Sequence, residues 1–182
     1  ANQVGGLTAA AVSAMDTSQV SNLSSTQLRS LKAAQVIALS STQVGKLTTT
    51  AMAGLSRVQI GYFETGDLAG LTTSQIEKLD TDQITGFNVS QMQALKTEQV
   101  NKISTQDMVA LRAIQLAAMT TTQVNALSTL QIKSLQNSQI AGLGASKVGN
   151  MLTAQVAALT TGQIDALTKL ELASLSSTQV GA

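Results

Sequence analysis

Large apolar residues recur along the chain at two positions of an eight-residue repeat. With Leu7 as position one, every eighth residue up to Leu175 is Leu, Ile, Met or Phe, which gives 22 repeats without an insertion. Position six, from Val12 to Val180, is Val, Ile, Leu or Met in all 22. A period held this strictly indicates a tandem-repeat architecture, in which each short unit buries its apolar face against neighbouring units.

The polar positions between the two apolar columns predict the start of a helix. Position two is Ser, Thr, Asp or Asn in 15 repeats, and position five is Gln in 16. A hydroxyl or carboxylate at the N-cap and a Gln three residues later form a capping box, and the apolar residues at positions one and six form the two ends of a hydrophobic staple. We therefore predict a helix of about six residues in every repeat, from position three to position eight.

Helices of this length persist only when they pack on one another. Because only positions one and two lie outside the helix, the chain must turn sharply in every repeat. We expect an all-α solenoid, a superhelix of very short helices with one helix per eight-residue repeat and roughly two to four repeats per turn. Positions one and six should point to the axis, and small residues at position eight should allow close approach at the axis. Six larger residues at position eight are expected to point outward or to lie at an edge: Asn22, Lys46, Tyr62, Lys78, Lys102 and Asn150.

The alternative architecture is a β-solenoid. Eight residues suit one rung of such a coil, and Thr, Val and Ile favour strands. However, the corners of the repeat lack the Gly, Asn, Asp and Pro that tight β turns require, and positions one, six and eight do not alternate as the residues of a half-buried strand do. The pattern favours the α-solenoid.

We expect one continuous array over residues 1–182. The opening letters ANQVGG place Gln3 and Val4 at positions five and six of a repeat, and Ala182 closes a repeat at the other end. Both ends resemble the interior of the array, so we expect it to continue, either in a longer chain or in a filament of copies.

Composition narrows the range of partners. Net charge is +1, and the basic residues are scattered from Arg29 to Lys169, so we expect no nucleic-acid partner. No apolar stretch approaches the roughly 18 residues of a membrane span, so we expect no membrane insertion. Aromatic residues are 2% of the chain, which leaves the core to aliphatic side chains, and the absence of cysteine excludes disulfides.

The chain offers little catalytic chemistry. Histidine is absent, which removes the commonest acid–base group and metal ligand. The close carboxylate pairs, Glu64 with Asp67 and Asp80 with Asp82, stand at positions two, four and five, where acids stabilise a helix N-terminus. The segment GLGASKVGN, which contains Lys147, lacks the spacing of a phosphate-binding loop and keeps the octapeptide register. We expect no enzyme activity and no catalytic, cofactor-binding or metal-binding residues.

The glutamine column and one aromatic pair are the candidate binding features. Aligned glutamines would form ladders, either as helix caps alone or as a recognition surface for sugars. Tyr62 beside Phe63, together with Lys46 and Lys78 at the same repeat position as Tyr62, is the candidate adhesive cluster.

The segments LTTSQIEKL, LTAQVAAL and LTTGQIDAL resemble the tandem octapeptides of long bacterial surface or secreted adhesin-like exoproteins. The resemblance covers the whole chain. It implies an extracellular or cell-surface structural protein, a stalk or filament segment. Its partners would be copies of itself, end to end, or further repeats of the same chain. The alternative that it implies is an adhesive module that binds glycans or a host surface through its polar flank.

Overall fold

The computed structural model describes residues 2–181. Within that range the regular secondary structure is entirely helical, so the β-solenoid alternative is wrong and the predicted all-α solenoid is confirmed. The contacts divide the chain into two compact units, one ending at Leu95 and one beginning at Lys96. The predicted single array over 1–182 stays a prediction, and its end residues Ala1 and Ala182 lie outside the described range.

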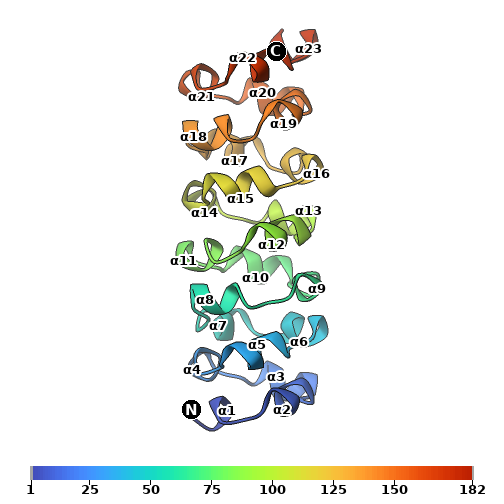
Figure 1. Ribbon diagram of the computed structural model, residues 1–182, viewed down its shortest axis with the longest axis vertical. Coiled ribbons are helices and arrows are strands. Elements are labelled where there is room, and N and C mark those ends of the chain that lie inside the picture. Colours follow the sequence, from blue (N-terminus) through green and yellow to red (C-terminus); the bar gives the residue numbers. More distant parts are fainter. Residues whose placement is uncertain (1, 182) are drawn as a thin grey trace. The chain divides into compact units, whose positions relative to one another are not determined.

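The first unit holds helices α1 to α12 (Figure 1), which are α1 Asn2–Gly5, α2 Ala9–Ser13, α3 Thr17–Ser21, α4 Ser25–Arg29, α5 Ala33–Ile37, α6 Ser41–Lys46, α7 Thr49–Met52, α8 Arg57–Ile60, α9 Thr65–Leu68, α10 Thr73–Glu77, α11 Thr81–Ile84 and α12 Val89–Ala94. The second unit holds helices α13 to α23, which are α13 Thr97–Val100, α14 Thr105–Ala110, α15 Ala113–Ala118, α16 Thr121–Asn125, α17 Thr129–Ser134, α18 Asn137–Ala141, α19 Ala145–Gly149, α20 Thr153–Ala157, α21 Thr161–Asp165, α22 Lys169–Ala173 and α23 Ser177–Val180.

Every helix from α2 to α23 begins at position three of a repeat, as predicted. The predicted caps at position two form: Asp16, for example, accepts from the backbone N–H of Gln19 at 2.8 Å, and the Gln19 side chain accepts from the Asp16 N–H at 2.9 Å. The helices have four to six residues, so many are shorter than predicted. The N–H of the next position one ends the helix early by bonding the carbonyl of position six, as Leu23 does to Val20 at 3.1 Å.

Successive turns of each unit pack helix on helix. α2 lies against α5 in the first unit, and α14 lies against α17 in the second, in each case three helices apart (Figure 1). Side-chain hydrogen bonds between turns span 25 to 31 residues. Since three repeats contain 24 residues and four contain 32, one turn takes more than three repeats and fewer than four. This result agrees with the predicted range.

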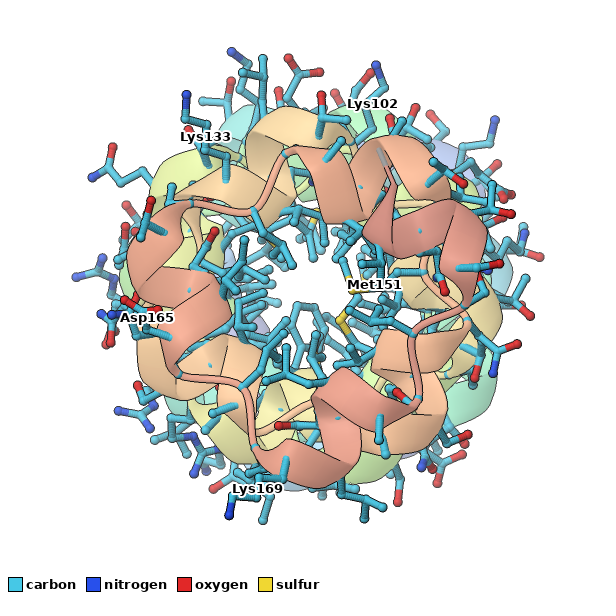
Figure 2. The ribbon with its side chains drawn as sticks, turned by 90° about the horizontal axis from the view of Figure 1, so that it is seen from above. Lys102, Lys133, Met151, Asp165 and Lys169 are labelled. Carbon is cyan, nitrogen blue, oxygen red and sulfur yellow. The ribbon has the colours of Figure 1, made fainter. Side chains whose placement is uncertain are left out.

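Positions one and six form the core of each unit. Ile132 at position six is 0% exposed and Met151 at position one is 3% exposed. Figure 2 shows Met151 pointing toward the centre of the coil in the second unit, whereas Lys133 and Lys169 point outward. The two apolar columns therefore face the axis, as the sequence predicts.

Position eight lies between turns and not at the axis. The six larger residues at this position are all exposed, which confirms their predicted outward direction. The small residues, however, allow close approach between successive turns: a Cβ atom on Gly54 would overlap the backbone of Ser25, and one on Gly70 would overlap that of Ser41. The prediction of close approach is thus right, and its location at the axis is wrong.

Candidate functional site

The most elaborate side-chain arrangement in the protein is the buried glutamine at position five. Gln75 is 2% exposed. Its Oε1 accepts from the backbone N–H of Thr72 at 2.7 Å, which completes the capping box of α10. Its Nε2 donates to the carbonyls of Val44 and Leu47, at 2.9 and 2.7 Å, in the previous turn. One amide therefore caps its own helix and joins two turns of the coil.

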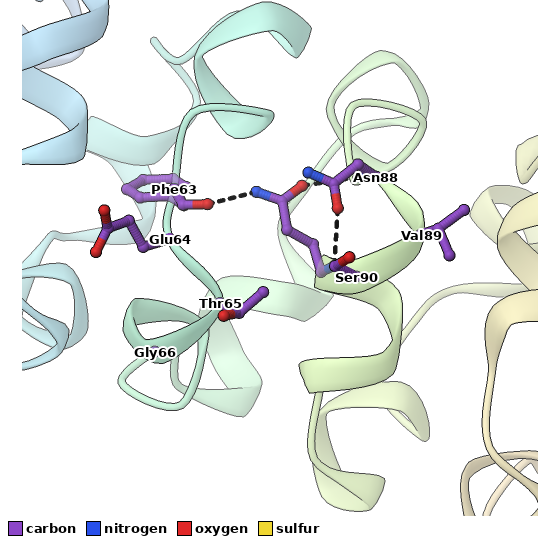
Figure 3. A pocket seen from close by; sticks show the side chains of 8 residues that line it. Phe63, Glu64, Thr65, Gly66, Asn88, Val89 and Ser90 are labelled. Atoms are coloured by element: carbon purple, nitrogen blue, oxygen red, sulfur yellow. Dashed lines mark hydrogen bonds between the residues drawn. The ribbon is translucent and has the colours of Figure 1, made fainter.

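The same arrangement recurs along both units. Glutamines donate to a carbonyl 28 residues earlier, at position one, and most also donate to one 31 residues earlier, at position six: Gln35, Gln43, Gln59, Gln75, Gln83, Gln91, Gln131, Gln139, Gln155, Gln163 and Gln179. Figure 3 shows one example, that of Gln91. Dashed lines mark the hydrogen bonds that join Gln91 to the carbonyl of Phe63 in one turn and to Asn88, at the helix start of the next turn.

The glutamine column is therefore not a recognition surface for sugars. Its side chains are buried from Gln35 onward, and their polar atoms bond within the protein. The capping prediction is confirmed, but the bonds between turns were missed. A signal for them exists in the composition, because a capping box accepts Glu as readily as Gln. Position five has 16 glutamines and a single glutamate, and this bias indicates that the amide donor is also used.

The repeat that this network defines matches one known family. The family model of the ALTTAQ repeat matches residues 12–49, 22–57, 60–97 and 100–137, which together cover more than half of the chain. The chain belongs to the ALTTAQ repeat family. No curated protein matches it. The six letters of the family description correspond to positions eight and one to five, as in ALTTGQ at 158–163. The predicted tandem-repeat character is thus confirmed.

Three residues that depart from the ALTTAQ pattern, Gly144, Lys147 and Glu171, together replace the hydrogen bonds that glutamines make elsewhere. Position five is Lys147 in one repeat and Glu171 three repeats later. Glu171 has no donor for the carbonyl 28 residues earlier, and its Oε1 instead accepts from the N–H of Gly144 at 3.1 Å. Gly144 has φ of 82°, the only positive φ among the described residues. The peptide before Gly144 thus presents its N–H where other repeats present a carbonyl.

Lys147 replaces the amide donor of a glutamine at position five. It has no acceptor for a capping box, but its Nζ donates to the carbonyl of Ala117 at 2.8 Å in the previous turn and lies 3.4 Å from the carbonyl of Leu143. Helix α19 still begins at position three, so the segment is a variant of the ALTTAQ repeat, as the sequence predicts.

Asp67 is an uncompensated departure from the ALTTAQ pattern. It stands at position five, where its side chain is one methylene shorter than that of Gln and has no amide donor. It is 8% exposed, and its Oδ2 is buried without a hydrogen-bond partner. Burial raises the pKa of the Asp67 carboxyl, a backbone hydrogen bond at Glu64 opposes that rise, and the nearby Glu64 charge adds to it. Asp67 is a weak point of the first unit.

Replacing Asp67 by glutamine is expected to stabilise the protein. In the register of its neighbours, the new Oε1 would accept from the Glu64 N–H, and the Nε2 would donate to the carbonyls of Val36 and Leu39. Each hydrogen bond contributes about 0.5–1.5 kcal/mol net, so the free energy of unfolding should rise by about 1–3 kcal/mol. Urea unfolding followed by circular dichroism at neutral pH measures the change.

The pH dependence gives a second check on Asp67→Gln. Because the folded-state pKa of Asp67 is raised, its charge destabilises the fold above that pKa, and acidification toward 3.8 removes the penalty. The advantage of the variant should therefore shrink as pH falls. The control is Asp82→Gln, at an exposed position four, which should change stability by less than about 0.5 kcal/mol. An advantage that grows on acidification would contradict this account of Asp67.

The other carboxylates lie at helix starts. Asp80 caps α11 by accepting from the N–H of Gln83 at 2.8 Å, as expected, and Asp82 is exposed in the first turn of the same helix. Glu64 stands at the N-cap of α9 without a side-chain cap bond, and in Figure 3 its side chain points away from Asn88. Among the described residues, no three acidic, histidine or cysteine side chains group as a metal site would require.

Tyr62 is not brought together with either lysine of the candidate adhesive cluster. Tyr62 is two repeats from Lys46 and two repeats from Lys78, whereas the helices that pack on each other are three repeats apart. All three side chains are exposed. A groove of about 670 Å³ lies between α9 and α12, lined by Glu64, Gly66 and Val89 among others, but its polar groups are mostly those of a helix cap.

The helices of the described range are also too short to cross a lipid bilayer. The longest have six residues.

Proposed function

We propose that this chain is a structural repeat protein, a stalk or filament segment of an extracellular bacterial surface assembly. One observation carries the proposal: the positions that the repeat keeps constant are occupied in holding the coil together. Positions one and six fill the core, position two caps most of the helices, and position five joins the turns. The residues that recur from repeat to repeat are therefore those that maintain the fold.

The outward positions support the same role. Position four is exposed in nearly every repeat and varies freely, with glycine at Gly66, glutamate at Glu98 and leucine at Leu130. Charged residues are 12% of the chain, and the remaining polar surface consists mainly of hydroxyl and amide side chains. A binding module would instead gather a few side chains at one place. A spacer needs only a soluble outer face.

The extracellular location is supported by the resemblance of the octapeptides to those of long bacterial surface and secreted exoproteins. Antibody labelling of intact, unpermeabilised cells tests it. We expect the chain to be labelled without permeabilisation, and labelling that requires permeabilisation would contradict the surface location.

A glycan array probed with the purified chain separates a stalk from an adhesin. We expect no saturable binding, and we expect the variants Tyr62→Ala, Lys46→Glu and Lys78→Glu to leave the unfolding midpoint unchanged, because all three side chains are exposed. Saturable binding that one of these variants abolishes, with an unchanged circular dichroism spectrum, would contradict the stalk and establish the adhesive alternative.

A further inference from the structure

The aspartate at position five of one repeat leaves oxygen atoms without donors inside the first unit. In the regular repeats the glutamine Nε2 donates to two carbonyls of the previous turn, as Gln43 does at 3.0 and 2.8 Å. For Asp67 the corresponding carbonyls are those of Val36 and Leu39. Within the described range the Leu39 carbonyl accepts no hydrogen bond, and the Asp67 Oδ2 is buried without a partner.

The register of the coil is unchanged around Asp67. Helix α9 begins at position three of its repeat, as the other helices do. A Cβ atom on Gly70 would overlap the backbone of Ser41 in the previous turn. The same separation along the chain brings Gly54 against Ser25. The Asp67 carboxylate therefore faces the place that a glutamine amide fills in the regular repeats.

The charge at this place is negative and unbalanced. Asp67 is 8% exposed, and the described residues include no basic side chain that pairs with it. The nearby Glu64 charge instead adds to the effect of burial in raising the pKa of the Asp67 carboxyl. A buried charge in a folded protein is ordinarily paired with an opposite charge or bound to a metal ion.

The other aspartate at position five shows what is different about Asp67. Ser104, at position two, donates from its Oγ to the Oδ2 of Asp107 at 2.6 Å. In the repeat of Asp67, position two is Glu64. A hydroxyl donor is thus replaced by a second carboxylate, which can only accept hydrogen bonds or bind a cation.

From this geometry we infer that the carboxylates of Asp67 and Glu64, together with the two facing carbonyls of the previous turn, bind a calcium ion. Calcium takes six to eight oxygen ligands, and water would complete its shell on the exposed side of Glu64. Its contacts of about 2.3–2.6 Å come closer than the roughly 2.0–2.1 Å of magnesium to the distances at the Gln43 amide.

The repeat pattern predicts no metal-binding residues, and the described residues hold no group of three acidic side chains. The inferred site does not need one, because main-chain carbonyls supply part of its oxygen atoms. The coil alone brings those carbonyls to Asp67, so the site is invisible in the sequence.

Urea unfolding with and without calcium tests the site. Weak calcium sites have dissociation constants on the order of 1 mM. At about 10 mM calcium chloride, the equilibrium constant for unfolding of the native chain should therefore fall about tenfold relative to its value in a chelator. Magnesium chloride at the same concentration should lower it less than about twofold, because magnesium requires shorter contacts.

The variant Asp67→Gln should lose the response to calcium, because its amide fills the site. Its stability advantage over the native chain should then be largest in the chelator and shrink by the same factor when calcium is added. The matched control is Asp82→Gln, which removes the same charge at an exposed position and should respond as the native chain does.

A native chain with the same urea midpoint in calcium and in the chelator would overturn the inference. So would an Asp67→Gln variant that responds as strongly as the native chain, since calcium would then act elsewhere. An equal response to magnesium would likewise contradict a site of this size.

Discussion

Replacing Ile132 by aspartate is expected to unfold the part of the second unit around α17, while the same change at Lys133 should be nearly silent. Ile132 is 0% exposed at position six. The substitution removes a buried aliphatic side chain and leaves a carboxylate without a partner in the core. The combined cost is about 4–5 kcal/mol or more. Lys133 is exposed and points outward (Figure 2), so Lys133→Asp should cost less than about 0.5 kcal/mol.

The loss should be local at first. Helix α17 packs on α14 and α20, and in a repeat array each element depends on its neighbours along the stack. Hydrogen exchange should therefore show lost protection first in these three helices. Equal effects of Ile132→Asp and Lys133→Asp on the urea midpoint would mean that position six does not carry the core.

The helix starts could be predicted from single repeats because their causes are local. A hydroxyl or carboxylate at position two and a side chain at position five lie three residues apart, and a capping box needs nothing else. Asp16 with Gln19 forms one even where the glutamine is exposed at the edge of the coil. The apolar columns could be predicted equally well, because a period of eight residues places Ile132 and Met151 in the core whatever the number of repeats per turn.

The bonds between turns could not be located from the sequence. A period of eight residues does not say how many repeats complete a turn, and here a turn is not a whole number of repeats. Gln75 reaches Val44 and Leu47, which are 31 and 28 residues away and match no multiple of eight. The same offset explains why the small residues of position eight were placed at the axis, when Gly70 in fact lies against Ser41 of another turn.

The effect of replacing glutamine at position five also depends on which residues the next turn brings close. Gly144 and Glu171 are 27 residues apart, so their compensation is invisible in either repeat alone. The sequence predicts that GLGASKVGN is a simple variant of the repeat, and this holds for its helix start. The reversed peptide at Gly144, which lets a glutamate replace an amide in the network between turns, is visible only in the structure.

Changing Gln75 to glutamate is expected to be among the most damaging isosteric substitutions in the first unit. The carboxylate keeps an acceptor for the Thr72 N–H, so the capping box survives. It loses the donor, however, and places negative charge against the carbonyls of Val44 and Leu47 at a site that is 2% exposed. Loss of a buried hydrogen-bond partner together with burial of a charge should cost about 3 kcal/mol or more at neutral pH.

The matched control is Gln19→Glu, because Gln19 caps its helix with the same geometry but bonds no other turn. It should cost less than about 1 kcal/mol. A protonated glutamate regains an O–H donor, and its burial in this site raises its pKa, so the cost of Gln75→Glu should fall on acidification while that of Gln19→Glu changes little. Equal urea midpoints for the two variants at neutral pH would show that the amide serves only as a cap. The coil would then be held by its apolar columns alone, and the preference for glutamine over glutamate at position five would need another cause.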